Sequence, residues 1–294
     1  MILNSSTTEV KYAIKDELID IDQLMDYNLS ILLSKNELSI SVVHSKTNRC
    51  LLGEKHSFSE GNNIQAVLHA CDEVFEAHHL LKAGFWGQIT VAITNNIFTL
   101  VPNSLFEPDN KTKYLALHNE ISDNQTVVSY QHKSFGATSV FAVNTEVIAW
   151  FKNLYPAKEV KFIHQTSAFI EGVLHNNKSS SEKSIYLNCE GGCLTIAVLS
   201  NAKLDYCNNF QYSTAQDIVY FTLFVMNELY LSTESIPMTV WGDINLKSTT
   251  FLNLYKFIRY IDLGEKPKTL TYGYIFDDID ENALFNTHNI YHCE

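Results

Sequence analysis

Two cysteines enclose a glycine turn and are the first residues whose spacing could do chemistry. Cys189 and Cys193 form a C-x3-C pair around Glu190-Gly191-Gly192. The pair could hold a metal only if two further ligands converged on it, because tetrahedral sites need four ligands. A tight β-hairpin, whose turn favours glycine, explains the same residues. We therefore predict a hairpin and no metal site.

Histidines form two further groups that could bind a metal. His78-His79 lies toward the polar side of an expected helix, whereas His288, His292 and Cys293 lie near the end of the sequence. We expect both groups to face solvent. The sequence contains no Gly-x-Ser-x-Gly, His-Glu-x-x-His, Walker A or dinucleotide-binding motif. These patterns predict no catalytic residue.

Composition and charge argue against several classes of partner. Hydrophobic residues make up 46% of the 294 residues and charged residues 18%, a balance typical of globular proteins. The net charge of −12, with no Lys/Arg cluster, repels nucleic-acid phosphates and anionic lipid headgroups. No apolar run reaches the roughly 18 residues that span a bilayer, and the start of the sequence lacks signal-peptide features. We predict a cytoplasmic protein with reduced cysteines that binds neither nucleic acid nor membrane.

The elements that must position these residues occur twice in the same order. In the first half we expect strands at 27–33, 38–44 and 50–55, a helix at about 64–81 and a strand at 88–93. In the second half we expect strands at 184–188, 193–199 and 203–208, a helix opening at Ser213-Thr214-Ala215-Gln216 and a strand at 237–241. The two copies lie about 150 residues apart, which indicates a duplicated domain rather than a solenoid.

Each half is expected to continue with a helix, a parallel strand and a closing helix. These elements are predicted at 145–154, 160–163 and 165–175 in the first half, and at 248–257, 258–263 and 279–287 in the second. The predicted domains are an N-terminal arm at 1–25, a first half at 26–176 and a second half at 182–294. A hairpin is inserted at about 126–143. A polar segment at 176–181 is the expected linker.

Two copies of a β-β-β-α-β-α-β-α order resemble the actin-like ATPase superfamily, an α/β, ribonuclease H-like fold with mixed sheets. Three segments are also similar to an uncharacterised bacterial family known as domain of unknown function 3822. They are Thr99-Leu100-Val101-Pro102-Asn103-Ser104-Leu105-Phe106, His164-Gln165-Thr166-Ser167-Ala168 and Trp241-Gly242-Asp243-Ile244. The resemblance implies a duplicated actin-like fold with no assigned activity.

The resemblance also indicates where a cofactor would bind. In the active superfamily each meander turn carries an Asp that holds magnesium, followed by a Gly that admits phosphate. Here Ser34-Lys35-Asn36-Glu37 has neither residue, whereas Glu190-Gly191-Gly192 keeps a glycine turn able to form a phosphate nest. Gly242 and Asp243 stand at the adenosine turn, where Asp243 could bind a ribose or cap the chain. We take Glu190, Gly191, Gly192, Gly242 and Asp243 as cofactor-binding candidates in the cleft between the halves.

Loss of the metal-holding carboxylates removes most of the machinery of phosphoryl transfer. The strand at 27–33 also lacks the carboxylate that a ribonuclease H-like nuclease requires. We therefore expect a non-catalytic actin-like scaffold without a cofactor, which binds a protein partner and could form a homodimer. The alternative is a nucleotide-binding switch or weak ATPase that uses ATP and magnesium in the cleft. A set of C-terminal aromatic residues could mark the partner surface or fill the second core: Phe251, Tyr255, Phe257, Tyr260, Tyr272, Tyr274 and Phe276.

Overall fold

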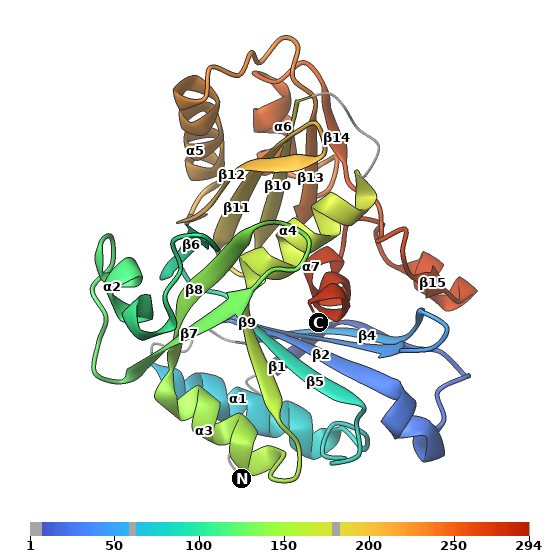
Figure 1. Cartoon of the computed structure of the whole chain (residues 1–294). Helices are drawn as coiled ribbons and strands as arrows, with labels where there is room; N and C mark the ends of the chain where they lie inside the picture. Colours follow the sequence, from blue (N-terminus) through green and yellow to red (C-terminus); the bar gives the residue numbers. More distant parts are fainter. Residues whose placement is uncertain (1–7, 59–62, 178–182, 294) are drawn as a thin grey trace, which may run out of the picture.

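The chain folds into two α/β halves, one above the other in Figure 1. The structure is a computed structural model and describes residues 8–58, 63–177 and 183–293. Each half has a meander of three antiparallel strands, followed by alternating helices and parallel strands. The predicted β-β-β-α-β-α-β-α order is therefore present twice. None of the described helices is long and apolar enough to cross a bilayer.

The first half is built on a seven-stranded mixed sheet. Its main path runs β1-β4-β3-β2-β5-β9, and β15 pairs with β4. The helices α1 (Ile64–Ala77) and α3 (Thr145–Leu154) lie together below this sheet in Figure 1. The strands are β1 (Thr8–Lys15), β2 (Tyr27–Leu33), β3 (Glu37–His44), β4 (Arg49–Phe58), β5 (Gln88–Ile93), β9 (Val160–His164) and β15 (Thr271–Tyr272).

Local sequence explains how α1 forms and packs. Asn63 caps the helix, because its side-chain oxygen accepts a hydrogen bond from the Ala66 N–H at 2.9 Å. The helix predicted at about 64–81 is present but ends at Ala77, and one apolar stripe along it is buried in the first core: Val67, Leu68, Cys71, Val74 and Phe75.

A small three-stranded sheet is inserted into the first half. It consists of β6 (Phe98–Pro102), β7 (Gln125–Gln131) and β8 (Ala137–Asn144), in the order β6-β8-β7. The predicted hairpin at 126–143 is formed by β7 and β8. The short helices η2 (Pro108–Asn110) and α2 (Lys111–Ala116) lie between β6 and β7 in the sequence.

The second half contains a five-stranded sheet in the order β12-β11-β10-β13-β14. The helix α5 (Ala215–Glu228) begins with a capping box made by Thr214 and Asp217. The predicted opening at Ser213-Thr214-Ala215-Gln216 begins one residue before this N-cap. The remaining elements are β10 (Ser184–Glu190), β11 (Cys193–Ser200), β12 (Lys203–Gln211), β13 (Met238–Gly242), β14 (Ile261–Leu263) and α6 (Thr249–Tyr255).

Two helices lie between the sheets in Figure 1, and aromatic residues pack across the junction. They are α4 (Gln165–Asn176) and α7 (Phe285–Asn289), and α7 contacts both β3 and β13. Phe285 stacks on Trp241 of β13 with ring centroids 4.3 Å apart, and it also meets Phe169 of α4. The core of the junction therefore combines residues from both halves.

Several details differ from the sequence predictions. Residues 8–15 of the predicted arm form β1, which pairs antiparallel with β4. The predicted helix at 279–287 becomes helical only at Phe285, because Leu284 adopts a left-handed conformation with φ 55°. A separate 3-10 helix, η3 (Tyr274–Asp278), precedes it. The predicted linker lies largely outside the described residues, since 178–182 are not described.

The expectation that the last histidines and cysteine face solvent is wrong for His288 and Cys293. Both are fully buried. His288 Nδ1 lies 3.0 Å from Ser41 Oγ on β3, and η4 (Ile290–His292) packs against β2 and β5. Burial lowers the pKa of His288 to about 3, so that the ring is neutral and fits this interior. The C-terminal segment is therefore part of the core.

Candidate functional site

The tips of two hairpins, one from each half, contact each other at the centre of the molecule. Gly191 and Gly192 form the β10–β11 turn with φ of +60° and +75°, left-handed values that favour glycine. A Cβ placed on Gly191 would lie only 2.9 Å from Cβ of Ser34, at the end of β2. Gly192 has open space, with Lys35 Cε as its nearest neighbour at 3.8 Å. The two hairpin turns therefore pack directly together.

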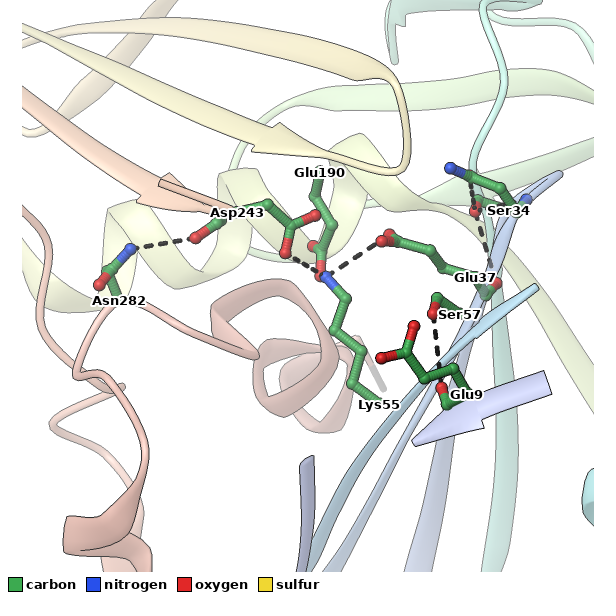
Figure 2. A network of polar contacts seen from close by, with 10 residues as sticks. Glu9, Ser34, Glu37, Lys55, Ser57, Glu190, Asp243 and Asn282 are labelled. Atoms are coloured by element: carbon green, nitrogen blue, oxygen red, sulfur yellow. Dashed lines mark hydrogen bonds and ion pairs between the residues drawn. The ribbon is translucent and has the colours of Figure 1, made fainter. Parts of the chain in front are cut away.

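Beside these tips, the Lys55 ammonium lies among three carboxylates from both halves (Figure 2). Its Nζ is 2.5 Å from Asp243 Oδ1, 3.2 Å from Glu190 Oε1 and 3.5 Å from Glu37 Oε2. The side chains of Lys55 and Glu190 are only 3% and 4% exposed, whereas that of Asp243 is 41% exposed. We call these four residues the Lys55 cluster.

Strand register explains how the first half supplies Lys55 and Glu37. Ser39 of β3 pairs with Lys55 of β4, and Glu37 pairs with Ser57. Side chains two residues apart on a strand share a face, and directly paired residues point the same way. Glu37 and Lys55 therefore project from one face of the sheet toward the second half.

A glycine turn after β13 positions Asp243. Gly242 has φ +99°, and a Cβ there would lie 2.3 Å from the Cys189 carbonyl oxygen, so the close approach requires glycine. The Asp243 N–H donates to the same carbonyl at 2.7 Å. Asn282 supports the turn by donating its side-chain amide to the carbonyls of Gly242 and Ile244 (Figure 2).

Burial and charge act in opposite directions within the Lys55 cluster. Burial alone would lower the pKa of Lys55, but Glu190, Asp243 and Glu37 outweigh it and raise the pKa. Burial raises the pKa of Glu190, and Lys55 only partly opposes this. Burial likewise raises the pKa of Glu37 to about 7. The ammonium therefore stays charged, and Glu37 is poised to hold a proton near neutral pH.

The structure brings the five predicted cleft residues to this one region. Glu190 and Asp243 meet through Lys55, Gly191 and Gly192 form the adjacent hairpin tip, and Gly242 makes the turn before Asp243. Their role in cofactor binding stays a prediction. Lys55 and Glu37, which hold these residues together, were not among the predicted site residues. The one signal was a charged Glu54-Lys55-His56 run at the end of an expected strand.

No metal centre accompanies the cluster within the described residues. No group of three or more His, Cys, Asp or Glu side chains there is arranged to hold an ion. Cys189 and Cys193 are free, buried thiols on the two strands of the predicted hairpin, and burial raises the pKa of Cys189 to about 12. His78, the better placed of the helix histidines, binds Glu54 at 3.1 Å.

Comparison with known proteins supports the fold and leaves the activity open. Residues 16–261 match the model of a family described as a protein of unknown function, DUF3822. A Bacteroides thetaiotaomicron VPI-5482 protein with an actin-like ATPase fold and unknown function is similar, with a TM-score of 0.79 and 19% identity. That match covers 94% of this chain and 100% of the other.

The PilM-PilN type IV pilus biogenesis complex is also similar, with a TM-score of 0.57 and 9% identity over 90% of this chain and 97% of that chain. No curated protein sequence matches the chain. At these identities the similar structures show the fold alone. The predicted actin-like fold class is thereby confirmed.

Proposed function

Because the chain belongs to the DUF3822 family, whose function is unknown, we propose from its own geometry that it is a non-catalytic actin-like scaffold that binds another protein. The Lys55 cluster carries this proposal. Glu190 and Asp243 are the carboxylates best placed to hold a magnesium ion in the cleft, and both already bind the Lys55 ammonium. A divalent cation would have to displace a buried, hydrogen-bonded charge, which is unfavourable.

Contact between the hairpin tips also argues against nucleotide binding in the cleft. Gly191 packs on Ser34, so a triphosphate could pass between the tips only if the halves separated and the Lys55 ion pairs broke. The first tip offers neither the Asp nor the Gly that active superfamily members use. The resting arrangement therefore favours a structural role over phosphoryl transfer.

Exposed aromatic side chains in the C-terminal part of the chain favour a protein partner. Of the predicted aromatic set, Phe251 and Phe276 are buried and Tyr272 is half-buried, so these three serve the core. The other four are at least half exposed, and aromatic residues are enriched at interfaces: Tyr255, Phe257, Tyr260 and Tyr274. The similar PilM fold occurs in a complex with PilN, which offers an analogy of fold for protein binding.

A thermal-shift measurement with magnesium-ATP tests the proposal. Saturation at about 100 times the Kd would stabilise a nucleotide-binding protein by about 2.7 kcal/mol and raise the Tm of a chain of this length by about 4 to 5 °C. We expect magnesium-ATP to cause no rise in Tm. We also expect the purified full chain to recover a partner protein from native extract. A rise in Tm that Gly191→Val and Gly192→Val abolish, or phosphate release in a clean assay, would overturn the scaffold proposal.

A further inference from the structure

Two free sheet edges, one from each half, line the same groove. β6 is the terminal strand of the inserted sheet, and β12 is the terminal strand of the five-stranded sheet (Figure 1). Two cavities of about 650 and 530 Å³ lie between them. Both cavities are lined by Leu100 of β6 and by Tyr206 and Cys207 of β12, so they adjoin. We call this space the β6–β12 groove.

The backbone of β6 turns alternate peptide groups toward the groove. The Ile97 carbonyl accepts from Ala142, and the Asn103 N–H donates to Gly136, so odd-numbered residues of this segment face β8. Because the direction alternates along a strand, the N–H and C=O groups of Phe98 and Leu100 point outward. Among the described residues, no strand pairs with β6 on this side.

The same argument applies to β12. The Tyr212 N–H donates to the Gly192 carbonyl, and the register is regular back to Tyr206, so even-numbered residues face β11. The peptide groups of Cys207, Asn209 and Gln211 therefore point into the groove. The Asn209 N–H already donates to the Asn208 side chain, which leaves the N–H groups of Cys207 and Gln211 for a ligand.

The groove walls are apolar and neutral rather than charged. Of the residues that the structure describes, Lys203 and Asp205 are the only Lys, Arg, Asp or Glu side chains that line the two cavities. The first cavity has apolar walls that include Phe135, Leu174 and Leu204. The second is lined by amide side chains that can satisfy peptide groups: Asn96, Asn119, Asn208 and Gln211. The Asn209 side chain also lines it but already donates to the Asn95 carbonyl. Such walls suit a peptide backbone better than a phosphate or a metal.

We propose that the β6–β12 groove binds an extended segment of a partner protein, which adds as a strand between the two edges. Main-chain hydrogen bonds to Leu100 and Cys207 would supply affinity, and the apolar pockets would accept alternate side chains. The net charge of −12 favours a segment with basic flanking residues. This inference rests on the proposed scaffold function and names the class of partner that it binds.

The probe is a ten-residue peptide selected from a displayed library on the purified full chain. Hydrogen exchange read by NMR should show that the peptide slows exchange at least tenfold at the amides of Phe98, Leu100, Cys207 and Gln211. Failure of the library to yield any binder, or protection confined to other edges such as β1 or β14, would overturn the groove as the binding site.

Proline variants test the main-chain hydrogen bonds directly. Leu100→Pro removes one outward N–H and leaves the β8 pairing intact, so we expect about tenfold weaker peptide binding. Leu100→Ala is the matched control, because it retains the N–H and should weaken binding less. If Leu100→Pro does not fold, Gln211→Pro tests the opposite wall. Equal affinity of the wild type and a folded proline variant contradicts the proposal.

The same variants separate this inference from the scaffold proposal. A partner recovered from native extract that binds the wild type and Leu100→Pro equally would refute the groove and leave the scaffold role intact. Magnesium-ATP binding without any peptide binder would refute both.

Discussion

At the scale of single residues, Lys55 is the central residue of the candidate site. Its ammonium joins Glu37 of its own half to Glu190 and Asp243 of the other half. Three carboxylates surround one ammonium. Because Glu190 is buried, removing the lysine would leave its negative charge without a partner, which is unfavourable. We therefore expect the lysine to stabilise the junction between the halves.

We predict that Lys55→Met destabilises the fold by about 3 to 5 kcal/mol, because methionine fills the space but leaves buried carboxylates unpaired. Urea unfolding followed by circular dichroism measures the free energy of unfolding. Lys46→Met is the control: Lys46 pairs with Asp26 at 2.7 Å, its side chain is 69% exposed, and its loss should change stability by less than about 1 kcal/mol. Equal losses for the two variants would contradict a structural role for Lys55.

We predict that Glu37 makes the protein less stable as pH rises from about 4.5 to 7. Burial raises its folded-state pKa to about 7 from the ordinary 4.5, so in this window the folded state retains a proton that the unfolded state releases. Relative to Glu37→Gln, the wild type should lose up to about 3 kcal/mol of unfolding free energy between pH 4.5 and pH 8. Urea unfolding of both chains at several pH values measures this difference. A difference independent of pH would refute the assignment.

At the scale of elements, the two meander hairpins act as contact surfaces between the halves. In the first half the β2–β3 turn presents Ser34, and in the second the β10–β11 turn presents Gly191. Glycine at that tip satisfies two needs, because the turn requires positive φ and the neighbouring hairpin leaves no space for a Cβ. The positive φ and the contact with Ser34 therefore account for Gly191, and no bound phosphate is needed to explain it.

We predict that Gly191→Ala is more destabilising than Gly192→Ala by at least about 1 kcal/mol. Both variants place alanine in a left-handed conformation, which costs roughly 1 to 2 kcal/mol. Only the Cβ at position 191 also meets Ser34, at 2.9 Å. Urea unfolding measures the loss of unfolding free energy for each variant. In a double-mutant cycle, Ser34→Gly should reduce the loss caused by Gly191→Ala. Equal losses, without coupling to Ser34, would show that the hairpin tips do not contact each other.

At the scale of the whole molecule, the two halves share one buried junction. Phe169 and Trp241 pack around Phe285 within a single buried cluster. The strand β15, which lies near the C-terminal end of the sequence, completes the sheet of the first half by pairing with β4. The C-terminal segment thus contacts both sheets. We therefore expect the halves to unfold as one unit.

We predict that Phe285→Ala lowers the free energy of unfolding by about 3 to 5 kcal/mol, the usual loss for a buried phenylalanine. Phe285 is 1% exposed and stacks on Trp241, so tryptophan fluorescence reports the junction together with Trp86 and Trp150 of the first half, while circular dichroism reports both sheets. The two signals should change together. Phe85→Ala, at a side chain 72% exposed, should have an effect within about 0.5 kcal/mol. Separate transitions in the wild type would contradict a shared junction.

Local patterns in the sequence determined most of the element order. The meander strands, the apolar stripe of α1, the glycine hairpin at 191–192 and the duplicated order follow from periodicity and turn chemistry within a few residues. The five candidate residues were also located from these turns. The alternation of Val10, Tyr12 and Ile14 could have revealed β1, which the analysis placed in an arm.

Only the tertiary structure decided what those residues contact. Lys55 and Asp243 are 188 positions apart, and His288 and Ser41 are 247 apart, so no local pattern records either contact. The same holds for Gly191 against Ser34 and for the free edges of β6 and β12, which face each other only after the halves assemble. The sequence determined the elements because they depend on neighbouring residues. The Lys55 cluster and the β6–β12 groove depend instead on how the two halves pack.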